Sequence, residues 1–162
     1  MEEKNKLLSL ASSPFKFRMY LLYKLPAAFF SGIRIRKIAK EKCVTSVPYK
    51  WLTQNPFRST YFASLSMAAE MSTGILALVN TYQRKPPVSM LVIKMEANYF
   101  KKAKGITFFS CEEGLKIAEV VNEAAKGGEG KTITVRSLGK NKDDELIAEF
   151  LFTWSFKSKI IG

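Results

Sequence analysis

The sequence predicts one α+β domain in which an antiparallel sheet wraps a single long helix. The predicted helix covers residues 59–83, where helix-compatible residues carry a single charge, that of Glu70. Segments on both sides of it alternate apolar and polar residues with the period of two that is typical of strands. With 162 residues, 47% of them hydrophobic, the chain is long enough for one substantial core and too short for two.

The first 25 residues are predicted to be a helical lead-in. Residues 2–12 and 15–23 fit two short helices, the second amphipathic and basic, with a break at Ser13 and Pro14 and an end near Pro26. We therefore place the lead-in at residues 1–25 and the α+β domain at residues 26–162.

Two strands are expected before the long helix. Isoleucine and arginine alternate over residues 33–36, and a β-rich run at residues 43–49 follows the turn at 40–42. The long helix itself would be long enough to span a bilayer. Glu70 would then lie near mid-membrane, and Ser, Thr, Asn and Gln dilute the apolar composition, so a buried core helix is favoured.

Four strands and a short helix are expected after it. Residues 88–100 and 106–111 form two strands, and a short helix runs from Glu112 and Glu113 to the glycines at 127 and 128. Residues 132–138 and 146–156 form a hairpin around a polar turn. We expect one face of the first strand to carry Leu91, Ile93, Met95, Ala97 and Tyr99. One face of the last should carry Leu146, Ala148, Phe150, Phe152, Trp154 and Phe156.

A lone helix that is apolar on nearly every side needs apolar partners on every side. A curved antiparallel sheet covers only part of such a helix. We expect a second copy of the chain to cover the remainder, because closed twofold pairing is the commonest way to bury a matching patch.

Charge is unevenly distributed along the chain. The formal net charge is +12, and residues 14–50 hold nine Lys or Arg against one acid, Glu41. Such an excess is typical of proteins that meet a polyanion, an anionic membrane or a phosphate-bearing ligand. An equal excess also occurs in proteins whose positive charge only keeps them soluble.

The sequence lacks the residues that several chemistries need. It has no histidine and no CxxC pair, and its cysteines, Cys43 and Cys111, lie in predicted strands. We therefore expect no metal, no disulfide framework, no Ser-His-Asp catalysis and no cysteine catalysis with its usual base. The amino-terminal segment lacks the order of a secretory signal, so we expect a cytoplasmic protein with reduced thiols.

Glu70 is the most informative residue. A carboxylate costs several kcal/mol to bury unpaired, so it must be hydrogen-bonded, paired or protonated. A functional interpretation makes it a general base or water-positioning group with a raised pKa. A structural interpretation has it accept backbone N–H bonds or pair with a basic residue such as Arg58.

The segment from Asn55 to Glu70, NPFRSTYFASLSMAAE, resembles the loop and helix start of hotdog-fold thioesterases of the phenylacetate-pathway type. There an Asn-containing loop leads into a His-Gly-Gly turn and then to an Asp or Glu on the central helix. Asn55 falls on the loop asparagine, residues 61–63 on the turn and Glu70 on the carboxylate. Through element order the resemblance extends over residues 26–157, and it is closest to a thioesterase-like branch of uncharacterised function.

The resemblance implies the hotdog fold, with a sheet wrapped around one central helix and an acyl-CoA held between two subunits. It implies that Glu70 is the base or nucleophile, that the Ala63 N–H is the oxyanion donor and that Asn55 positions water or the carbonyl. Helix-start amides aim positive potential at a developing oxyanion, which makes the Ala63 role physically consistent.

This sequence departs from the family pattern at the turn. Tyr61, Phe62 and Ala63 replace the histidine and both glycines, and Phe62 would narrow the approach of a thioester to the backbone. The loss of histidine removes the dehydratase and hydratase chemistry of the superfamily. We expect Tyr61 and Phe62 to contact substrate.

A basic segment follows the strand at residues 88–100. By resemblance, Lys101, Lys102 and Lys104 match the part of the family that meets the phosphates of coenzyme A, where ammonium groups attract a nucleotide diphosphate. A solvated basic turn explains them equally well.

We predict an acyl-CoA thioesterase-like hydrolase that acts by water attack assisted by Glu70. It is expected to be a homodimer or a pair of dimers, with no cofactor beyond the coenzyme A of its substrate. One alternative is a noncatalytic acyl or lipid binder on the same scaffold. A lesser alternative is a basic protein that binds nucleic acid or a membrane surface, although no RRM, KH or helix-turn-helix pattern accompanies the basic residues.

Overall fold

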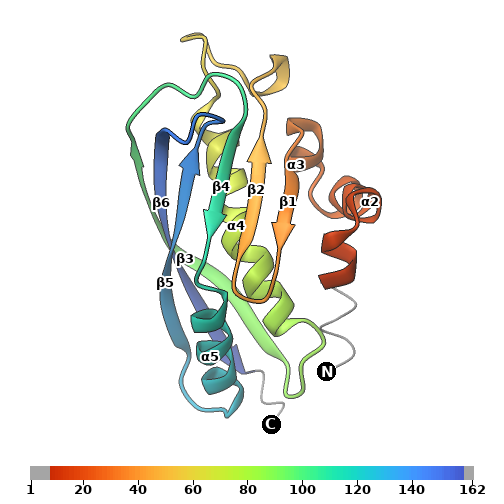
Figure 1. The fold of residues 1–162 in the computed structure, drawn as a ribbon. Coiled ribbons are helices and arrows are strands. Elements are labelled where there is room, and N and C mark those ends of the chain that lie inside the picture. Colours follow the sequence, from red (N-terminus) through yellow and green to blue (C-terminus); the bar gives the residue numbers. More distant parts are fainter. Residues whose placement is uncertain (1–7, 159–162) are drawn as a thin grey trace.

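A six-stranded antiparallel sheet and one long helix form the body of the structure, a computed structural model that describes residues 8–158 (Figure 1). The strands are β1 (Arg34–Ile38), β2 (Cys43–Val47), β3 (Val88–Tyr99), β4 (Thr107–Cys111), β5 (Lys131–Lys140) and β6 (Leu146–Ser158). The helices are α2 (Pro14–Lys24), α3 (Pro26–Ser31), α4 (Phe62–Thr81) and α5 (Gly114–Ala125), with a short 3-10 turn, η1 (Trp51–Thr53). Residues 8–12 are helical, and the rest of the helix predicted over residues 2–12 lies outside the described residues.

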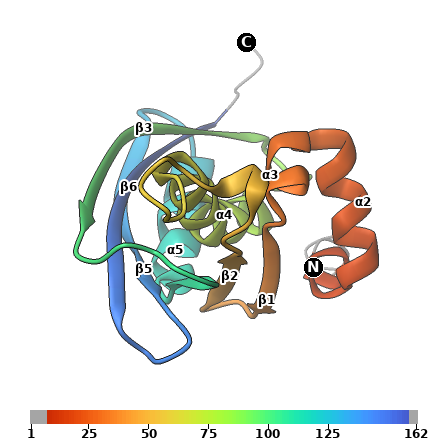
Figure 2. The ribbon, with the colours of Figure 1, turned by 90° about the horizontal axis from the view of Figure 1, so that it is seen from above.

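The sheet curves around α4. Its strand order is β1-β2-β4-β5-β6-β3, so that β1 and β3 are the two edge strands. Seen from above, the strands form an arc with α4 inside it, while α2 and α3 lie outside β1 (Figure 2). This is the predicted arrangement of a sheet wrapped around one central helix.

Buried hydrogen bonds fasten α4 to the sheet. The Thr45 hydroxyl of β2 donates to the carbonyl of Ala68 at 2.6 Å, and the Ser72 and Ser137 hydroxyls lie 2.8 Å apart. Small polar side chains therefore let the helix approach the strands closely. By length and composition α4 could cross a membrane, with a mean hydropathy of 1.5 over 18 residues, but 61% of that window is buried inside the protein. The prediction of a core helix is confirmed.

Aromatic residues of β6 fill the space between sheet and helix. The Phe150 and Phe152 rings stack with centroids 5.9 Å apart, and Phe109 of β4 meets Phe150 edge-on at 5.6 Å. A Cβ atom at Gly139 would lie 2.4 Å from the Phe109 ring, so this position of β5 accepts only glycine. The predicted inner face of the last strand is confirmed for Ala148, Phe150, Phe152, Trp154 and Phe156, all of them buried.

The prediction that five alternating residues of the strand at residues 88–100 share one face is wrong, because the face changes within the strand. The register of β3 against β6 shifts between Val92 and Lys94, which is a bulge at Ile93. Because a bulge inserts one residue, the alternation restarts after it. Leu91 and Ile93 consequently lie on the other face, 65% and 53% exposed. Met95, Ala97 and Tyr99 pair with buried residues of β6, although Met95 and Tyr99 are themselves 46% and 45% exposed.

The prediction that Leu146 shares the buried face of the last strand is wrong, because of a second bulge. Gly139 pairs with Ala148 but Lys140 pairs with Leu146, so that Ile147 is the extra residue of β6. Ile147 is buried and Leu146 is exposed, contrary to the predicted alternation.

Helix α3 was not predicted from the sequence. Pro26 ends α2 as expected, but proline is also favourable at the first position of a helix, and a six-residue helix starts there. Gly32, with a φ of 77°, ends α3 in the left-handed conformation and starts the turn into β1.

The two cysteines lie opposite each other in the pairing of β2 with β4. Cys43 and Cys111 are both free and buried. Burial raises the pKa of Cys43 to about 12 and that of Cys111 to about 11, so neither thiol is a nucleophile at neutral pH.

Candidate functional site

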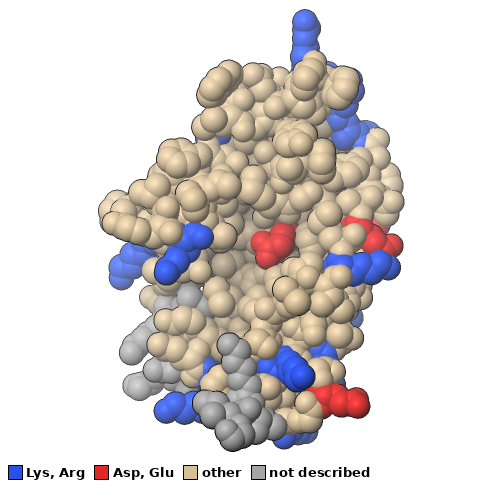
Figure 3. Space-filling model, turned by 180° about the vertical axis from the view of Figure 1, so that it is seen from behind, with Lys and Arg blue, Asp and Glu red and all other residues tan. Residues whose placement is uncertain are grey.

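The sheet leaves one side of α4 open, and this side carries Glu70. Most of α4 is buried, but half-buried residues recur on one helix face: Ala63, Ser66, Met67, Glu70 and Leu78. Strands β1, β2 and β4 lie in front of α4 in Figure 1. The opposite face is mostly uncharged, with acidic atoms visible in a central hollow (Figure 3).

The Glu70 carboxyl group lies over the following turn of α4. A Cβ atom at residue 74 would lie 2.6 Å from Oε1 of Glu70 and 3.4 Å from Cη2 of Trp154, so the absence of a side chain at Gly74 makes room for the carboxyl. Nε1 of Trp154 donates to Oγ1 of Thr73 at 3.1 Å, which fixes the indole ring. The space beside Gly74 is therefore bordered by the Glu70 carboxyl and by the edge of the Trp154 ring.

No partner for the Glu70 carboxyl is recorded among residues 8–158. The six ion pairs of this range all involve other carboxylates, so the alternative in which Arg58 pairs with Glu70 is not supported. Burial raises the pKa of Glu70 from 4.5 to about 7. At neutral pH the group is therefore present in both protonation states, as a general base that also returns a proton must be.

The start of α4 presents open N–H groups. The backbone carbonyl of Tyr61 accepts from the N–H groups of Ser64 and Leu65 at 2.9 and 3.2 Å, while its side chain forms no capping bond. Within the described part of the chain, no acceptor is recorded for the N–H groups of Phe62 and Ala63. These groups carry the positive end of the helix dipole and suit a developing oxyanion.

Two aromatic side chains stand at this helix start. The rings of Tyr61 and Phe62 lie 4.8 Å apart, and both are exposed. They are therefore available to a ligand that approaches the start of α4.

Asn55 organises the loop that leads into α4. Its Oδ1 accepts the N–H groups of Phe57 and Ser59 at 3.0 and 3.2 Å and also faces the Ser59 hydroxyl at 3.2 Å. Arg58 takes a left-handed φ of 57° in the same turn. The side-chain oxygen of Asn55 thus accepts hydrogen bonds from its own loop, and the side-chain Nδ2 is the group left to bind a ligand.

The basic segment after β3 is joined to this loop. The carbonyl of Ala103 accepts the N–H of Thr60 at 2.9 Å, two residues before α4 begins. Lys102 and Lys104 flank Ala103 and are exposed. Lys101 pairs with Glu145 at 2.6 Å, which partly neutralises it. The structure therefore brings Lys102 and Lys104 near the start of α4.

One chain does not bring Ala63 and Glu70 together. They lie seven residues apart on one helix face, about 10 Å along the axis at a rise of roughly 1.5 Å per residue. The Glu70 carboxyl also turns toward Gly74, away from Ala63. A single thioester carbonyl cannot contact both groups of the same chain.

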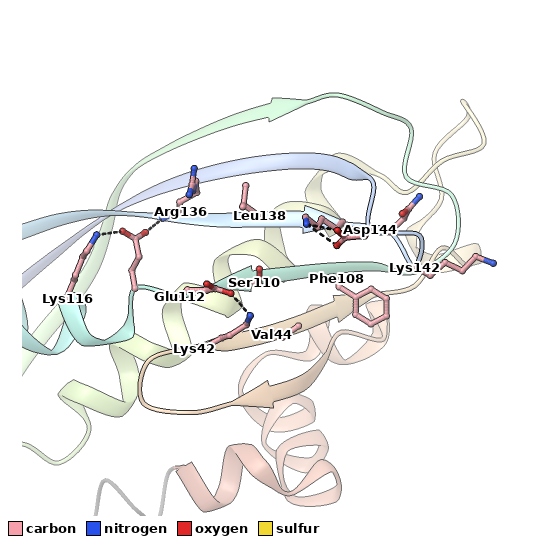
Figure 4. Close-up of a pocket in the computed structure, with 13 residues that line it drawn as sticks. Lys42, Val44, Phe108, Ser110, Glu112, Lys116, Arg136, Leu138, Lys142 and Asp144 are labelled. Carbon is pink, nitrogen blue, oxygen red and sulfur yellow. Dashed lines mark hydrogen bonds and ion pairs between the residues drawn. The ribbon is translucent and has the colours of Figure 1, made fainter.

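A cavity of about 630 Å³ lies on the outer face of the sheet (Figure 4). The strand residues in its floor alternate with buried ones that face α4, so the sheet separates the cavity from Glu70. Its acids, Glu112, Glu113 and Asp144, each pair with a lysine. Among the described residues the cavity holds no unpaired carboxylate, and it is not part of the candidate site.

Sequence reasoning missed two residues that shape the site, Gly74 and Thr73. A signal for Gly74 was present, because a glycine one turn after the only charge of a long helix is an unfavourable choice that needs a packing reason. Thr73 gave no such signal, since its bond to Trp154 depends on the register of β6 against α4.

Comparisons with known proteins identify the fold. A family model described as "Domain of unknown function (DUF4442)" matches residues 16–155. A protein of unknown function from Pseudomonas aeruginosa, described as a probable thioesterase, superposes with a TM-score of 0.74 at 20% identity, over 90% of this chain and 97% of that one. Among curated proteins no sequence matches the chain.

Two further solved structures have the same fold. The thioesterase HI1161 from Haemophilus influenzae gives a TM-score of 0.65 at 13% identity, covering 90% of this chain and 91% of that one. The E. coli PaaI protein of the phenylacetic acid degradation operon gives 0.63 at 11% identity, covering 90% and 92%. The predicted hotdog fold and the resemblance to phenylacetate-pathway-type thioesterases are confirmed.

The variant Glu70→Gln should be more stable than wild type at high pH. The difference between their free energies of unfolding should increase as pH rises. The pKa of Glu70 is about 7 in the folded protein against 4.5 as the ordinary value, so ionisation opposes folding; this cost is absent below pH 4.5 and complete above about pH 7. The shift corresponds to roughly 3 kcal/mol at most. Urea denaturation of both proteins at several pH values measures the difference. Glu119→Gln, at an exposed position of α5, should show no comparable rise.

Gly74→Ala should lower the pKa of Glu70. The new Cβ would displace the carboxyl toward water, and solvation favours the ionised form. A carbon-detected NMR titration should show the midpoint moving from near 7 toward 4.5. Gly130→Ala is the matched control, because a Cβ there meets nothing closer than 3.6 Å. An unchanged midpoint in Gly74→Ala would contradict the described carboxyl position.

Proposed function

The chain belongs to the DUF4442 family of unknown function, and we propose that this member hydrolyses an acyl thioester, with acyl-CoA as the substrate class. The observation that carries the proposal is the Glu70 carboxyl, half-buried, without a recorded partner in residues 8–158, and with its pKa raised to about 7. Such a group weakens the fold at neutral pH, and groups of this kind cluster at catalytic sites. The solved structures described as thioesterases support the substrate class.

Glu70 acts as the general base in this proposal. Its carboxylate removes a proton from water while the water oxygen attacks the thioester carbonyl carbon. The carbonyl oxygen becomes an oxyanion, which the Ala63 N–H stabilises at the positive end of α4. The C–S bond then breaks, and the protonated Glu70 returns its proton to the leaving thiolate. The products are a free acid and a thiol.

The site is completed by a second copy of the chain. Because Ala63 and Glu70 of one helix lie about 10 Å apart, two α4 helices related by a twofold axis are needed to place one copy's carboxyl against the other's helix start. The β3 edge suits this pairing. It is 12 residues long, pairs only with β6 among the described strands, and exposes Leu91 and Ile93.

The substrate would be bound at the start of α4. Tyr61 and Phe62 offer exposed aromatic surface to an apolar group, and Lys102 and Lys104 offer charge to phosphates a few residues away. Lys101 contributes less, because Glu145 already pairs with it. Asn55 would orient water or the carbonyl through Nδ2, the part of its amide that the loop does not use.

A noncatalytic acyl binder is the second candidate function. Phe62 favours it, since a phenyl ring stands where the related thioesterases have glycine, and it is 54% exposed at the helix start. A binder would keep the apolar surface and the lysines but would not need Glu70.

Glu70→Gln should lose activity with little loss of binding. A missing general base costs roughly 100- to 10,000-fold in rate. Free-thiol release from short, long and aromatic acyl-CoAs measures turnover, and Glu119→Gln is the matched control. If no acyl-CoA turns over while one raises the melting temperature, the protein is a binder and the assignment of Glu70 is wrong.

Wild-type turnover should rise with pH through the pKa of Glu70. The base acts only when it is ionised, so kcat/KM should be half-maximal near pH 7 and about 100-fold lower at pH 5. A pH profile with no inflection between pH 5 and 8 would argue against this carboxylate as the base.

The double variant Leu91→Lys, Ile93→Lys should convert a dimer into a monomer. Lysines on an edge strand oppose edge-to-edge pairing, and two copies would place like charges together. Sedimentation velocity measures the mass. Leu115→Lys, at an exposed leucine of α5, should leave the mass unchanged. The monomeric variant should also lose thioester hydrolysis, because each site needs groups of both copies.

A further inference from the structure

Helix α2 presents a row of large apolar side chains to water. Phe15, Met19 and Tyr23 follow one another at intervals of four residues and therefore lie on one helix face. Phe15 is 76% and Tyr23 79% exposed. The opposite face carries Phe17 and Leu21, which are buried in the core. The helix is thus anchored by one face and remains apolar on the other.

The neighbouring α3 extends this surface. Leu25, between the two helices, and Phe30 of α3 are also exposed. We call the surface formed by Phe15, Met19, Tyr23, Leu25 and Phe30 the α2 flank. Large apolar side chains that are exposed together on two consecutive helices are a feature of interaction sites.

Three arginines stand beside the α2 flank. Arg18 of α2 and Arg34 and Arg36 of β1 line a cavity of about 350 Å³ together with Phe15. Among the described residues, 8–158, no acidic residue lines this cavity, and none of the six ion pairs includes these arginines. The sequence places no Asp or Glu between Glu3 and Glu41.

Two of the arginines are already held in position. The Arg18 guanidinium lies 3.9 Å from the centre of the Phe29 ring and donates to the Phe29 carbonyl at 3.3 Å. Nε of Arg36 donates to the Ser46 hydroxyl at 2.7 Å. Burial and the adjacent charge of Arg34 lower the pKa of Arg18, as expected where positive charges are crowded. Fixed guanidinium groups with N–H donors to spare are suited to phosphate oxygens.

We propose that the α2 flank docks the protein onto an anionic phospholipid surface, with Phe15, Met19 and Tyr23 in the interface and lipid phosphate at Arg18, Arg34 and Arg36. Aromatic and apolar residues beside basic ones on a surface helix are the pattern of such docking. Lys16 and Lys24, both exposed on α2, add to the attraction.

A second copy of the chain is a poor occupant of this surface. Under twofold symmetry the arginines of one copy would meet those of the other, and residues 8–158 of neither copy place an acid in the cavity. An anionic bilayer supplies both the missing negative charge and the apolar cover. The proposal does not depend on hydrolysis, because the α2 flank lies outside β1 (Figure 2) and includes neither Glu70 nor the start of α4.

Vesicle co-sedimentation of the full chain tests the proposal. The protein should bind vesicles of equal parts phosphatidylcholine and phosphatidylglycerol, should not bind pure phosphatidylcholine vesicles, and should lose binding as salt rises. Arg34→Gln should weaken binding roughly five-fold, the effect of one basic residue at an anionic surface. Phe15→Ser with Tyr23→Ser should weaken it at least about ten-fold.

Matched controls separate docking from general charge and stickiness. Lys142→Gln and Leu115→Ser change an exposed lysine and an exposed leucine outside the α2 flank and should leave vesicle binding unchanged. Circular dichroism and acyl-CoA turnover of the α2 flank variants should equal those of wild type. If the wild-type protein turns over acyl-CoA but does not bind anionic vesicles, the docking is rejected and the proposed hydrolysis stands.

Four outcomes would overturn the proposal. They are the absence of binding to anionic vesicles, equal losses in the control variants, and full binding by Phe15→Ser, Tyr23→Ser. The fourth is binding of another phosphate-bearing ligand at the arginines that does not change when Phe15 and Tyr23 are replaced. Inorganic phosphate that displaces the protein from vesicles at constant ionic strength would indicate a soluble phosphate site. Binding of a single-stranded oligonucleotide that falls equally in Arg34→Gln would indicate a nucleic-acid surface.

Discussion

Helix α4 is apolar on nearly every side, and the other elements are arranged to keep it from water. The sheet curves because a flat one would cover a single stripe of the helix. Small hydroxyl-bearing residues at the contact let strands and helix approach while their own polar groups stay bonded, as Ser72 and Ser137 do. The arc of strands leaves one face of α4 uncovered. The Glu70 carboxyl lies on this face, and the N–H groups without a recorded acceptor in residues 8–158 lie at its start.

The open face explains how a costly carboxyl persists in a core helix. Glu70 remains only partly buried, and Gly74 provides space that a larger residue would fill. Glycine in a helix interior itself costs about 1 kcal/mol relative to alanine. Two local choices that each weaken the fold therefore support one another at the same place, which is the pattern expected where a site, rather than stability, has determined the residues.

Periodicity predicted the fold because each element has a strong pattern. The charge-poor run of α4 and the alternating aromatics of β6 leave few alternatives. Patterns failed where one extra residue changes the alternation, at Ile93 and Ile147, since the cause of each bulge is the pairing with another strand. For the site, Glu70 stood out as a lone charge. The bonds of the Asn55 side chain to its own loop, and the position of the carboxyl over Gly74, depend on backbone geometry that composition does not encode.

Two apolar surfaces differ in charge, and this difference decides which partner suits each. On β3, Leu91 and Ile93 adjoin Lys94 and Glu96, which pair with each other at 2.6 Å and leave the surface balanced. A balanced patch can meet its own copy, because twofold symmetry then brings together no net charge. The α2 flank lies beside three arginines, and no acid of residues 8–158 lines their cavity, so like charges would oppose its pairing with a second copy. Since β1 and β3 are opposite edges of the sheet, self-pairing at β3 and docking at the α2 flank can occur in one assembly.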